Sequence, residues 1–400
     1  LAKTVFALWR RYRRLCRRDA LARACRFAMK LEGLRVIDLS VFLPGPYLTL
    51  AMADHGAEVI KVEPPGEGDP GRHIGLSDGS STVFFRNLNR GKKSIVVDLK
   101  DATQREALLK LCETADVFVE SFRPGAVDRL GVGYEAVRAR NPRIVYCSIS
   151  AFGQDSEWRH RPAHDLALEA ESGLVSMTLG NDGKPAISGI PAADVLAGLQ
   201  GLSGVLMALL RRERTGVGDF VDISMHDVTI GGMLNILGPT FAEDRQPIPA
   251  HERTTGGAAF YRPYETKDGR HLVLAGQEPK FIHNLLGAFG RPELAELCLR
   301  GPGPHQQPVA EFLSAEFRKK TLAEWQDDLA KLDVCYGRVN TLPEAVAHPN
   351  LVARGMIRRD ERGRRHVGPP IRFRHEPAEP VLCEPALGEH TASILKKISE

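Results

Sequence analysis

The chain alternates short apolar runs with helical patterns from residue 34 onward. The apolar runs are rich in β-branched residues and end at turn-forming residues, which is typical of strands. They cover residues 35–39, 58–62, 94–99, 116–120 and 143–149. Helical patterns separate several of them, at residues 46–55 and about 103–114. Because no run shows strict in/out alternation, we predict an α/β fold whose parallel sheet is covered by helices on both faces.

The loops that follow these strands are the expected place for a ligand, because open α/β sheets bind ligands at the carboxyl ends of their strands. These loops are residues 41–46, 64–69 and 121–129. Basic residues lie close to the strand ends: Lys61, Arg86, Arg90, Lys92, Lys93, Arg123 and Arg129. We expect them to gather at one edge of the sheet and hold phosphate groups. For any single one of them, a solvated charged surface is the simpler explanation.

Residues 192–212 are predicted to form a second kind of helix, directly after Pro191. The segment is apolar on nearly all sides, so we expect a buried helix. Small residues at positions 197, 198, 201, 203 and 204 would let neighbouring elements pack closely. Its first turn carries one acid, Asp194. The helix dipole favours a carboxylate at this place, so a structural role and a chemical role both fit Asp194.

A chain of 400 residues exceeds what one hydrophobic core usually supports, so we predict two domains. The large domain is assigned to residues 29–235, and a linker with a small α+β domain to residues 236–337. A hairpin is expected in the small domain at residues 264–274, with the turn at Lys267-Asp-Gly269. Residues 338–400 are expected to return to the large domain.

Charge is distributed unevenly along the chain. The formal net charge is +4, but residues 1–28 hold nine Lys or Arg and a single acid, Asp19. The remainder is therefore mildly acidic, and no nucleic-acid partner is predicted. The basic extension fits a targeting peptide, a helix that contacts a membrane or nucleic acid, or sequence upstream of a natural start at Met29. We favour the last, because a clear domain pattern begins directly after Met29.

Several classes of protein are disfavoured by what the sequence lacks. Its seven cysteines are scattered without a C-x-x-C pair, which argues against disulfides or zinc and fits a reducing cytosol. No apolar run approaches the roughly 18 residues that span a bilayer, so no membrane partner is predicted. A P-loop, a G-x-G-x-x-G after the first strand and H-E-x-x-H are absent, and the G-x-S-x-G match at residues 75–79 lies in a loop that is rich in Gly, Asp and Ser. His160 and His164 are four residues apart, but no H-E-x-x-H motif contains them, and no metal site is predicted.

Eight segments together resemble one known family. They are LEGLRVIDLS (31–40), PGPYLTLAMADHGAEVIKVE (44–63), NRGKKSIVVDLK (89–100), FVESFRPGAVDRLG (118–131), NPRIVYCSISAFGQ (141–154), TGVGDFVDISMHD (215–227), HPNLVARGM (348–356) and VGPPIRF (367–373). Their order and spacing resemble the family III CoA-transferases, which include formyl-CoA transferase, carnitine CoA-transferase and alpha-methylacyl-CoA racemase. The resemblance runs from Leu31 to about Arg374 and leaves out the basic extension.

The resemblance implies a Rossmann-like large domain, a small domain and a homodimer of interlocked rings. It also implies that coenzyme A binds at the sheet of the large domain, as part of an acyl-CoA substrate and not as a tightly bound cofactor. On this basis the expected coenzyme A ligands are Lys61, Arg90, Lys93, Arg123 and Arg129. In this family the catalytic aspartate lies in a segment that matches Gly189-Ile-Pro-Ala-Ala-Asp194.

Two reactions compete within this resemblance. As a transferase, the enzyme would move coenzyme A from an acyl-CoA donor to a carboxylic-acid acceptor through an aspartyl-CoA thioester on Asp194. As a racemase, it would remove a thioester α-proton on one face and return it on the other, with His164 and Asp194 as opposed bases and Glu278 assisting. His164 stands where many transferases carry Tyr. A structural role also remains open for each of them: His164 could be a hydrogen-bonded structural histidine, and Glu278 could be an exposed acid in a loop.

The transferase is the preferred hypothesis. Residues 169–174 and 190–198 are similar to the transferase version of these segments, and Ala167-Leu168 replaces the Asn-Tyr of the racemase pattern. A non-catalytic CoA-binding homologue is a third possibility, against which the presence of Asp194 argues. We expect a cytoplasmic homodimeric enzyme.

Overall fold

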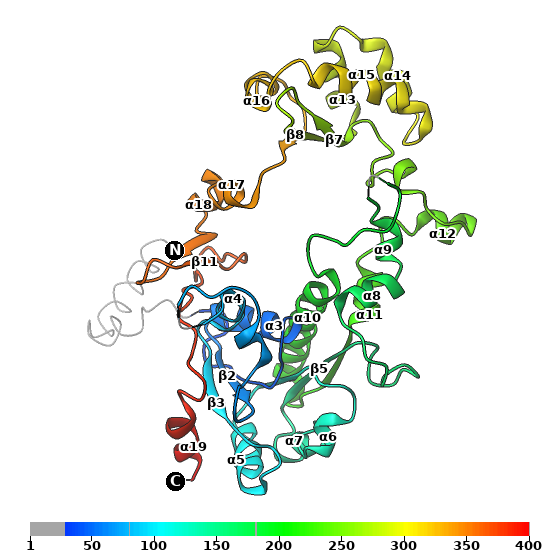
Figure 1. Ribbon diagram of the computed structural model, residues 1–400. Helices are drawn as coiled ribbons and strands as arrows, with labels where there is room; N and C mark the ends of the chain where they lie inside the picture. Colours follow the sequence, from blue (N-terminus) through cyan, green and yellow to red (C-terminus); the bar gives the residue numbers. More distant parts are fainter. Residues whose placement is uncertain (1–28, 80, 181, 400) are drawn as a thin grey trace, which may run out of the picture. The chain divides into compact units, whose positions relative to one another are not determined.

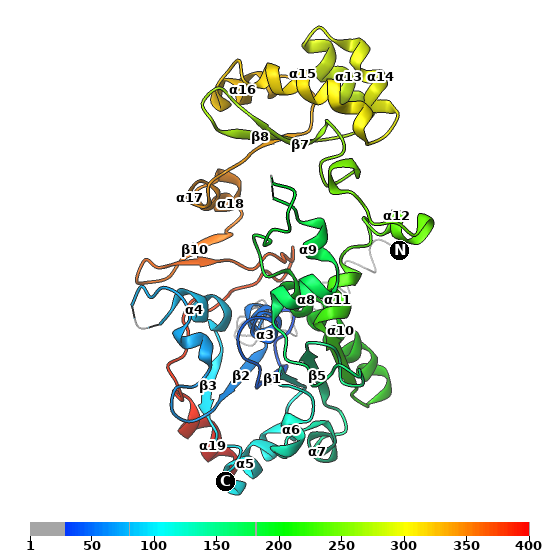
Figure 2. The ribbon, with the colours of Figure 1, turned by 45° about the vertical axis from the view of Figure 1, so that its right-hand side comes forward.

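The structure is a computed structural model that describes residues 29–399, apart from residues 80 and 181. It contains two compact units (Figures 1 and 2). Among the described residues, unit 1 comprises residues 29–163, Asp194–Met225 and 352–399, and unit 2 comprises His164–Ala193 and His226–Leu351. This division differs from the predicted domains, because residues 164–193 join unit 2 and the later boundaries fall at 225 and 351. The basic extension lies outside the described residues.

Six parallel strands form the sheet of unit 1, in the order β3-β2-β1-β4-β5-β6. They are β1 (Arg35–Asp38), β2 (Glu58–Glu63), β3 (Lys93–Val96), β4 (Val117–Glu120), β5 (Val145–Ser150) and β6 (Phe220–Ser224). The predicted parallel sheet is confirmed. Strand β6 is not among the predicted strands, because the exposed Asp222 interrupts its short apolar run. Strand order reverses between β1 and β4, which is where such sheets bind ligands.

Helices cover both faces of this sheet. They are α3 (Pro44–Asp54), α4 (Val83–Asn89), α5 (Ala102–Cys112), α6 (Ala126–Arg129), α7 (Tyr134–Arg140), α10 (Ala192–Thr215) and α19 (Thr391–Ser399). One core joins Leu108 of α5 and Val137 of α7 to Ile37 of β1. On α10, an added Cβ at Gly201 would lie 2.8 Å from Leu48 of α3. In both views α3 and α10 lie side by side.

The C-terminal segment lies on unit 1. It begins with a hairpin of β10 (Ile357–Arg359) and β11 (Arg365–Val367). The N–H of Gly91 then donates to the carbonyl of Cys383 at 2.8 Å, and the N–H of His390 donates to the carbonyl of Ser94 at 2.9 Å. These bonds tie the last residues to the outer strand, β3. A short 3-10 helix, η1 (Pro70–His73), completes unit 1.

Unit 2 is built on a three-stranded antiparallel sheet of β7 (Tyr261–Glu265), β8 (His271–Ala275) and β9 (Tyr336–Arg338). The predicted hairpin around Gly269 is present as β7 and β8. The remaining elements are α8 (Asp165–Glu171), α9 (Leu174–Met177), α11 (Met225–Gly231), α12 (Gly238–Glu243), η2 (Pro249–His251), α13 (Pro279–Ala288), η3 (Pro292–Leu294), α14 (Ala295–Leu299), η4 (Pro304–Gln306), α15 (Gln307–Phe317), α16 (Leu322–Leu329), α17 (Leu342–Val346) and α18 (Pro349–Ala353). The hydrophobic core of unit 2 includes Leu285, Leu313 and Trp325.

Helix α10 has 24 residues and, by length and composition, passes as a bilayer-spanning helix within the described part of the chain. One helix of this kind is weak evidence for a membrane span. A core helix of a globular protein passes the same test. Gly198, Gly201 and Gly204 bring α10 into close contact with α3 and β6, which is the packing of a core helix.

Candidate active site

Asp194 is the third residue of α10 and is partly buried. One helical turn later, an added Cβ at Gly198 would lie 2.8 Å from the carbonyl oxygen of Pro44. Pro44 is the first residue of α3, the helix that follows the carboxyl end of β1. The glycine therefore lets the beginning of α10 approach the carboxyl edge of the sheet, and it places Asp194 beside that edge.

A cavity of about 380 Å³ opens at the same edge, between the loops that follow β1 to β4. Each of the three loops predicted to bind a ligand contributes to its wall, through Val41, Pro64 and Phe122. Most of the remaining wall is apolar: Leu39, Val62, Val97, Leu99 and Leu130. An apolar cavity with a few polar groups is typical of a small-molecule site.

Lys61 lies against this cavity, but its ammonium group faces away from solvent. Its side chain has no exposed surface and its Nζ lies 2.6 Å from Oδ2 of Asp69. The same Nζ donates to the carbonyl oxygen of Ser40 at 2.9 Å. Ser40 follows β1 and Asp69 follows β2, so the lysine joins two loops that carry the cavity wall. A cation that is fully enclosed and paired has no free face for a phosphate, which argues against the predicted role of Lys61.

A second buried pair lies beside the first. The Nζ of Lys92 is 3.0 Å from Oδ2 of Asp38, and neither side chain is exposed. Burial alone would raise the pKa of Asp38, but the Lys92 and Lys61 ammonium groups, with hydrogen bonds from Ser40 and Thr49, hold it at about 2. Burial lowers the pKa of Lys92 to about 8. These four charged groups neutralise one another next to the strand-end loops, so the loss of any one of them would leave an unpaired buried charge.

Two arginines from the expected basic cluster are also buried and paired with carboxylates. Arg90 is almost fully buried and its Nε donates to Oδ1 of Asp54 at 3.1 Å. Arg86 is buried as well and forms a bidentate pair with Asp78. The guanidinium of Arg90 is therefore committed to the protein, which argues against its predicted role as a coenzyme A ligand.

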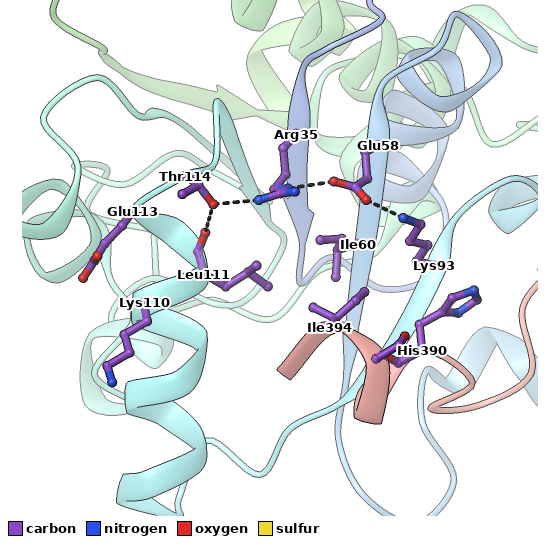
Figure 3. Close-up of a pocket in the computed structure, with 11 residues that line it drawn as sticks. Arg35, Glu58, Ile60, Lys93, Lys110, Leu111, Glu113, Thr114, His390 and Ile394 are labelled. Carbon is purple, nitrogen blue, oxygen red and sulfur yellow. Dashed lines mark hydrogen bonds and ion pairs between the residues drawn. The ribbon is translucent and has the colours of Figure 1, made fainter. Parts of the chain in front are cut away.

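Lys93 lies at the opposite end of the strands. It is the first residue of β3 and forms an ion pair with Glu58, the first residue of β2. Figure 3 shows Glu58 between Lys93 and Arg35, and Arg35 in turn donates to Thr114. These residues line a cavity of about 450 Å³ at the amino ends of the strands. The structure therefore does not bring the predicted basic residues together at one edge.

Arg123 and Arg129 are the members of the cluster that lie at the carboxyl edge with exposed side chains, in and after the β4 loop. Glu120 orders this loop, because its Oε2 accepts the N–H of Phe122 at 2.8 Å. Burial raises the pKa of Glu120 to about 7. Lys100, which the sequence analysis does not single out, is exposed on the cavity rim. Its position directly after the predicted strand 94–99 was the available signal.

His164 and Glu278 belong to unit 2, whereas Asp194 belongs to unit 1. His164 is the residue that precedes α8, and Glu278 is the residue that precedes α13. Both side chains are exposed. They come from separate helices of the unit, and the catalytic roles predicted for them stay predictions. Within the described residues there is no group of three or more His, Cys, Asp or Glu that could hold a metal ion.

Comparisons with known proteins agree with this architecture. A family model described as CoA-transferase family III matches residues 31–391. Succinyl-CoA:glutarate CoA-transferase of Mus musculus is 30% identical over 383 residues, which cover 94% of this chain and 87% of that protein. Acetyl-CoA:oxalate CoA-transferase of Acetobacter aceti is 35% identical over 331 residues, covering 82% and 85%. The crystal structure of a CaiB/BaiF family protein from Brucella suis matches with a TM-score of 0.81 and 31% identity, over 93% of this chain and 100% of that chain.

Proposed function

This chain belongs to CoA-transferase family III and transfers coenzyme A between carboxylic acids, and we propose that it does so through a covalent thioester on Asp194. The observation that carries this assignment is the position of Asp194, a carboxylate in the first turn of α10 beside the carboxyl edge of the sheet. The amide groups at a helix N-terminus favour negative charge. They support an ionised carboxylate, which is the form that attacks a thioester.

The covalent steps balance without an external acid or base. The Asp194 carboxylate attacks the thioester carbonyl of the donor, the C–S bond breaks, and coenzyme A leaves as a thiolate from a mixed anhydride. The thiolate then attacks the Asp194 carbonyl carbon, which releases the donor acid as a carboxylate and forms the aspartyl-CoA thioester. The acceptor carboxylate attacks this thioester, and the same two exchanges run in reverse. One difficult exchange is thereby divided into easier ones.

For coenzyme A we propose the cavity at the carboxyl ends of β1 to β4. Its apolar wall suits a stacked or enclosed base, and Phe122 supplies an aromatic face. Lys100, Arg123 and Arg129 are exposed at the same edge and can pair with phosphates. Lys61, Arg90 and Lys93 are left out of this proposal because each is paired within the protein.

For the acids we propose a small dicarboxylate as acceptor and a short acyl-CoA as donor. The support is the names of the relatives, which include enzymes for succinyl-CoA with glutarate and for acetyl-CoA with oxalate. A panel of mono- and dicarboxylates, tested with succinyl-CoA as donor, checks this choice. Faster transfer to long-chain monocarboxylates than to any dicarboxylate would contradict it.

We also propose a cytoplasmic homodimer. Helix α10 leaves a row of large apolar residues exposed, at Leu199 (44%), Leu206 (39%), Met207 (68%) and Leu210 (63%). Their spacing puts them on one face of the helix, and a contiguous apolar face of this kind marks an interaction site. A second copy of the chain is the occupant that the family predicts. Sedimentation should give a particle of twice the 44.0 kDa chain, and a monomer at micromolar concentration would contradict this.

The central proposal is tested by trapping the intermediate. The enzyme is incubated with acyl-CoA and no acceptor, treated with hydroxylamine, and digested for mass spectrometry. We expect a hydroxamate on Asp194, and no adduct and no transfer in Asp194→Asn. Asp327→Asn, an exposed aspartate on α16, is the matched control. Full transfer by Asp194→Asn contradicts the proposal. In deuterated water, exchange of the α-proton of a chiral 2-methylacyl-CoA without transfer would favour the racemase.

A further inference from the structure

The residue before α10 is Pro191, whose side chain has no polar group that could cap the helix. The first N–H groups of a helix have no backbone partner within the helix, so other groups must satisfy them. Asp194 is the third residue of this helix.

Glu169 of α8 supplies that partner. Its Oε1 accepts the N–H of Ala192, the first residue of α10, at 2.7 Å. The hydroxyl of Ser188 lies 3.0 and 2.9 Å from the two carboxylate oxygens and 2.7 Å from the carbonyl oxygen of Ile190, so its single proton is shared among these acceptors. One carboxylate therefore holds both the end of the incoming loop and the first turn of the helix.

The Glu169 carboxylate is buried, with 1% of the residue exposed. No ion pair to it is found in the part of the chain that the structure describes, so its charge is balanced by the N–H and hydroxyl donors and by the positive end of α10. Residues 189 and 190 are exposed. The two loop residues 189 and 190 therefore make few contacts that could hold the helix start in place. The contacts with Glu169 hold it.

We infer that Glu169 is a positioning residue for the transfer reaction, and this inference rests on the proposed role of Asp194. Each turnover converts the Asp194 carboxylate into neutral anhydride and thioester forms and then restores it. Because Glu169 accepts the N–H of Ala192, the helix start keeps an anion throughout these covalent steps, whatever the charge of Asp194.

The geometry predicts a graded series of variants. Glu169→Ala removes all three contacts and should lower kcat by about 10²-fold, since small displacements of a reacting group cost this much. Glu169→Gln keeps an oxygen acceptor for Ala192 but loses the charge, and should lower kcat by about three- to tenfold. Ser188→Ala leaves the helix contact intact but removes one contact of the Glu169 carboxylate, and should also lower kcat by about three- to tenfold. The KM for acyl-CoA should change by less than about threefold in each, because the coenzyme A cavity is untouched.

The measurement must separate positioning from loss of folded enzyme. We would therefore express kcat per active site, counted as the hydroxylamine-trapped adduct, and measure the rate constant of adduct formation in a single turnover. A purely structural role would lower the melting temperature and the number of active sites while leaving both rate constants unchanged. Glu311→Ala, an exposed glutamate on α15 of the same unit, is the matched control.

Two outcomes overturn different statements. If Glu169→Ala forms the adduct within about twofold of the parent rate, the positioning role is wrong and the proposed function stands. If Asp194→Asn, run in parallel, still transfers coenzyme A, the proposed function itself is wrong. Should Glu169→Ala not fold, Glu169→Gln and Ser188→Ala decide, and parental rate constants in both of these variants overturn the inference.

Discussion

The ion pair of Lys61 and Asp69 distinguishes a structural lysine from a coenzyme A ligand. The perturbation is Lys61→Met, which keeps most of the side-chain volume and removes the charge. In the variant, Asp69 would remain with 1% of its side chain exposed and without its cation. The Ser40 carbonyl would also lose a donor. We therefore expect a large loss of stability and no specific effect on coenzyme A binding.

The expected magnitude follows from the geometry. At the observed separation of 2.6 Å and an effective dielectric constant of about 20, the attraction between the charges is about 6 kcal/mol. Most of this offsets the cost of removing both groups from water, so the pair adds little net stability over an apolar one. Removing one partner is different, because the other charge stays buried. Such truncations typically cost about 3–5 kcal/mol.

The assay is urea unfolding at fixed protein concentration, followed by circular dichroism, with steady-state kinetics on the same preparations. Lys100→Met is the matched control, because Lys100 is exposed on the same cavity. It should change stability by less than about 0.5 kcal/mol and raise the KM for acyl-CoA. The double variant Lys61→Met with Asp69→Asn should recover much of the loss, because Asn is neutral and keeps the oxygen that accepts the Gly71 N–H.

One result would refute this reasoning. If Lys61→Met stays within about 1 kcal/mol of the parent and raises the KM for acyl-CoA tenfold or more, the ammonium binds a phosphate and the ion pair is dispensable. Failure of the double variant to recover stability would show that the lost contact to Ser40, and not the unpaired charge of Asp69, accounts for the effect.

Two further predictions concern stability. Burial raises the pKa of Glu120 from 4.5 to about 7, so the stability that its bound proton provides is complete below about pH 4.5 and is lost as the pH rises through 7. Glu120→Gln keeps the acceptor for the Phe122 N–H. By urea unfolding, the variant should be more stable than the parent by about 2–3 kcal/mol at pH 8 and equally stable near pH 4.5. Equal stability of the two proteins at pH 8 would contradict this. Gly198→Ala should cost about 1–3 kcal/mol, because its Cβ would meet the Pro44 carbonyl. Gly287→Ala, with open space around it, should be neutral or stabilising in the same thermal melts, and a similar loss in both variants would contradict the steric argument.

The sequence by itself determined the architecture of the sheet and the place of its ligand edge. Five β-branched runs separated by helical patterns are a local property of the chain, and they specify a parallel sheet without any knowledge of distant contacts. Asp194 could also be found in this way, because an acid at the start of a long apolar helix stands out in the pattern. The same applies to the three loops, each of which contributes to the cavity.

The local sequence pattern was not sufficient to predict which basic residues lie at the ligand edge of the sheet. Lys93 precedes its strand, so the parallel order places it at the amino end, although in sequence it lies only seven residues from Lys100 at the other end. Lys61 pairs with Asp69, and Arg90 pairs with Asp54, only in the folded protein. A charged residue near a strand end in sequence is therefore not necessarily a charged residue at a ligand site.

The contact of Glu169 with the start of α10 could be found only in the tertiary structure. Ala192 lies 23 residues farther along the chain than Glu169, and no spacing rule connects an acid on one short helix with the first N–H of another. The physical reason is general: an uncapped helix start can be recognised locally, but the group that satisfies it can come from any segment that folding brings close.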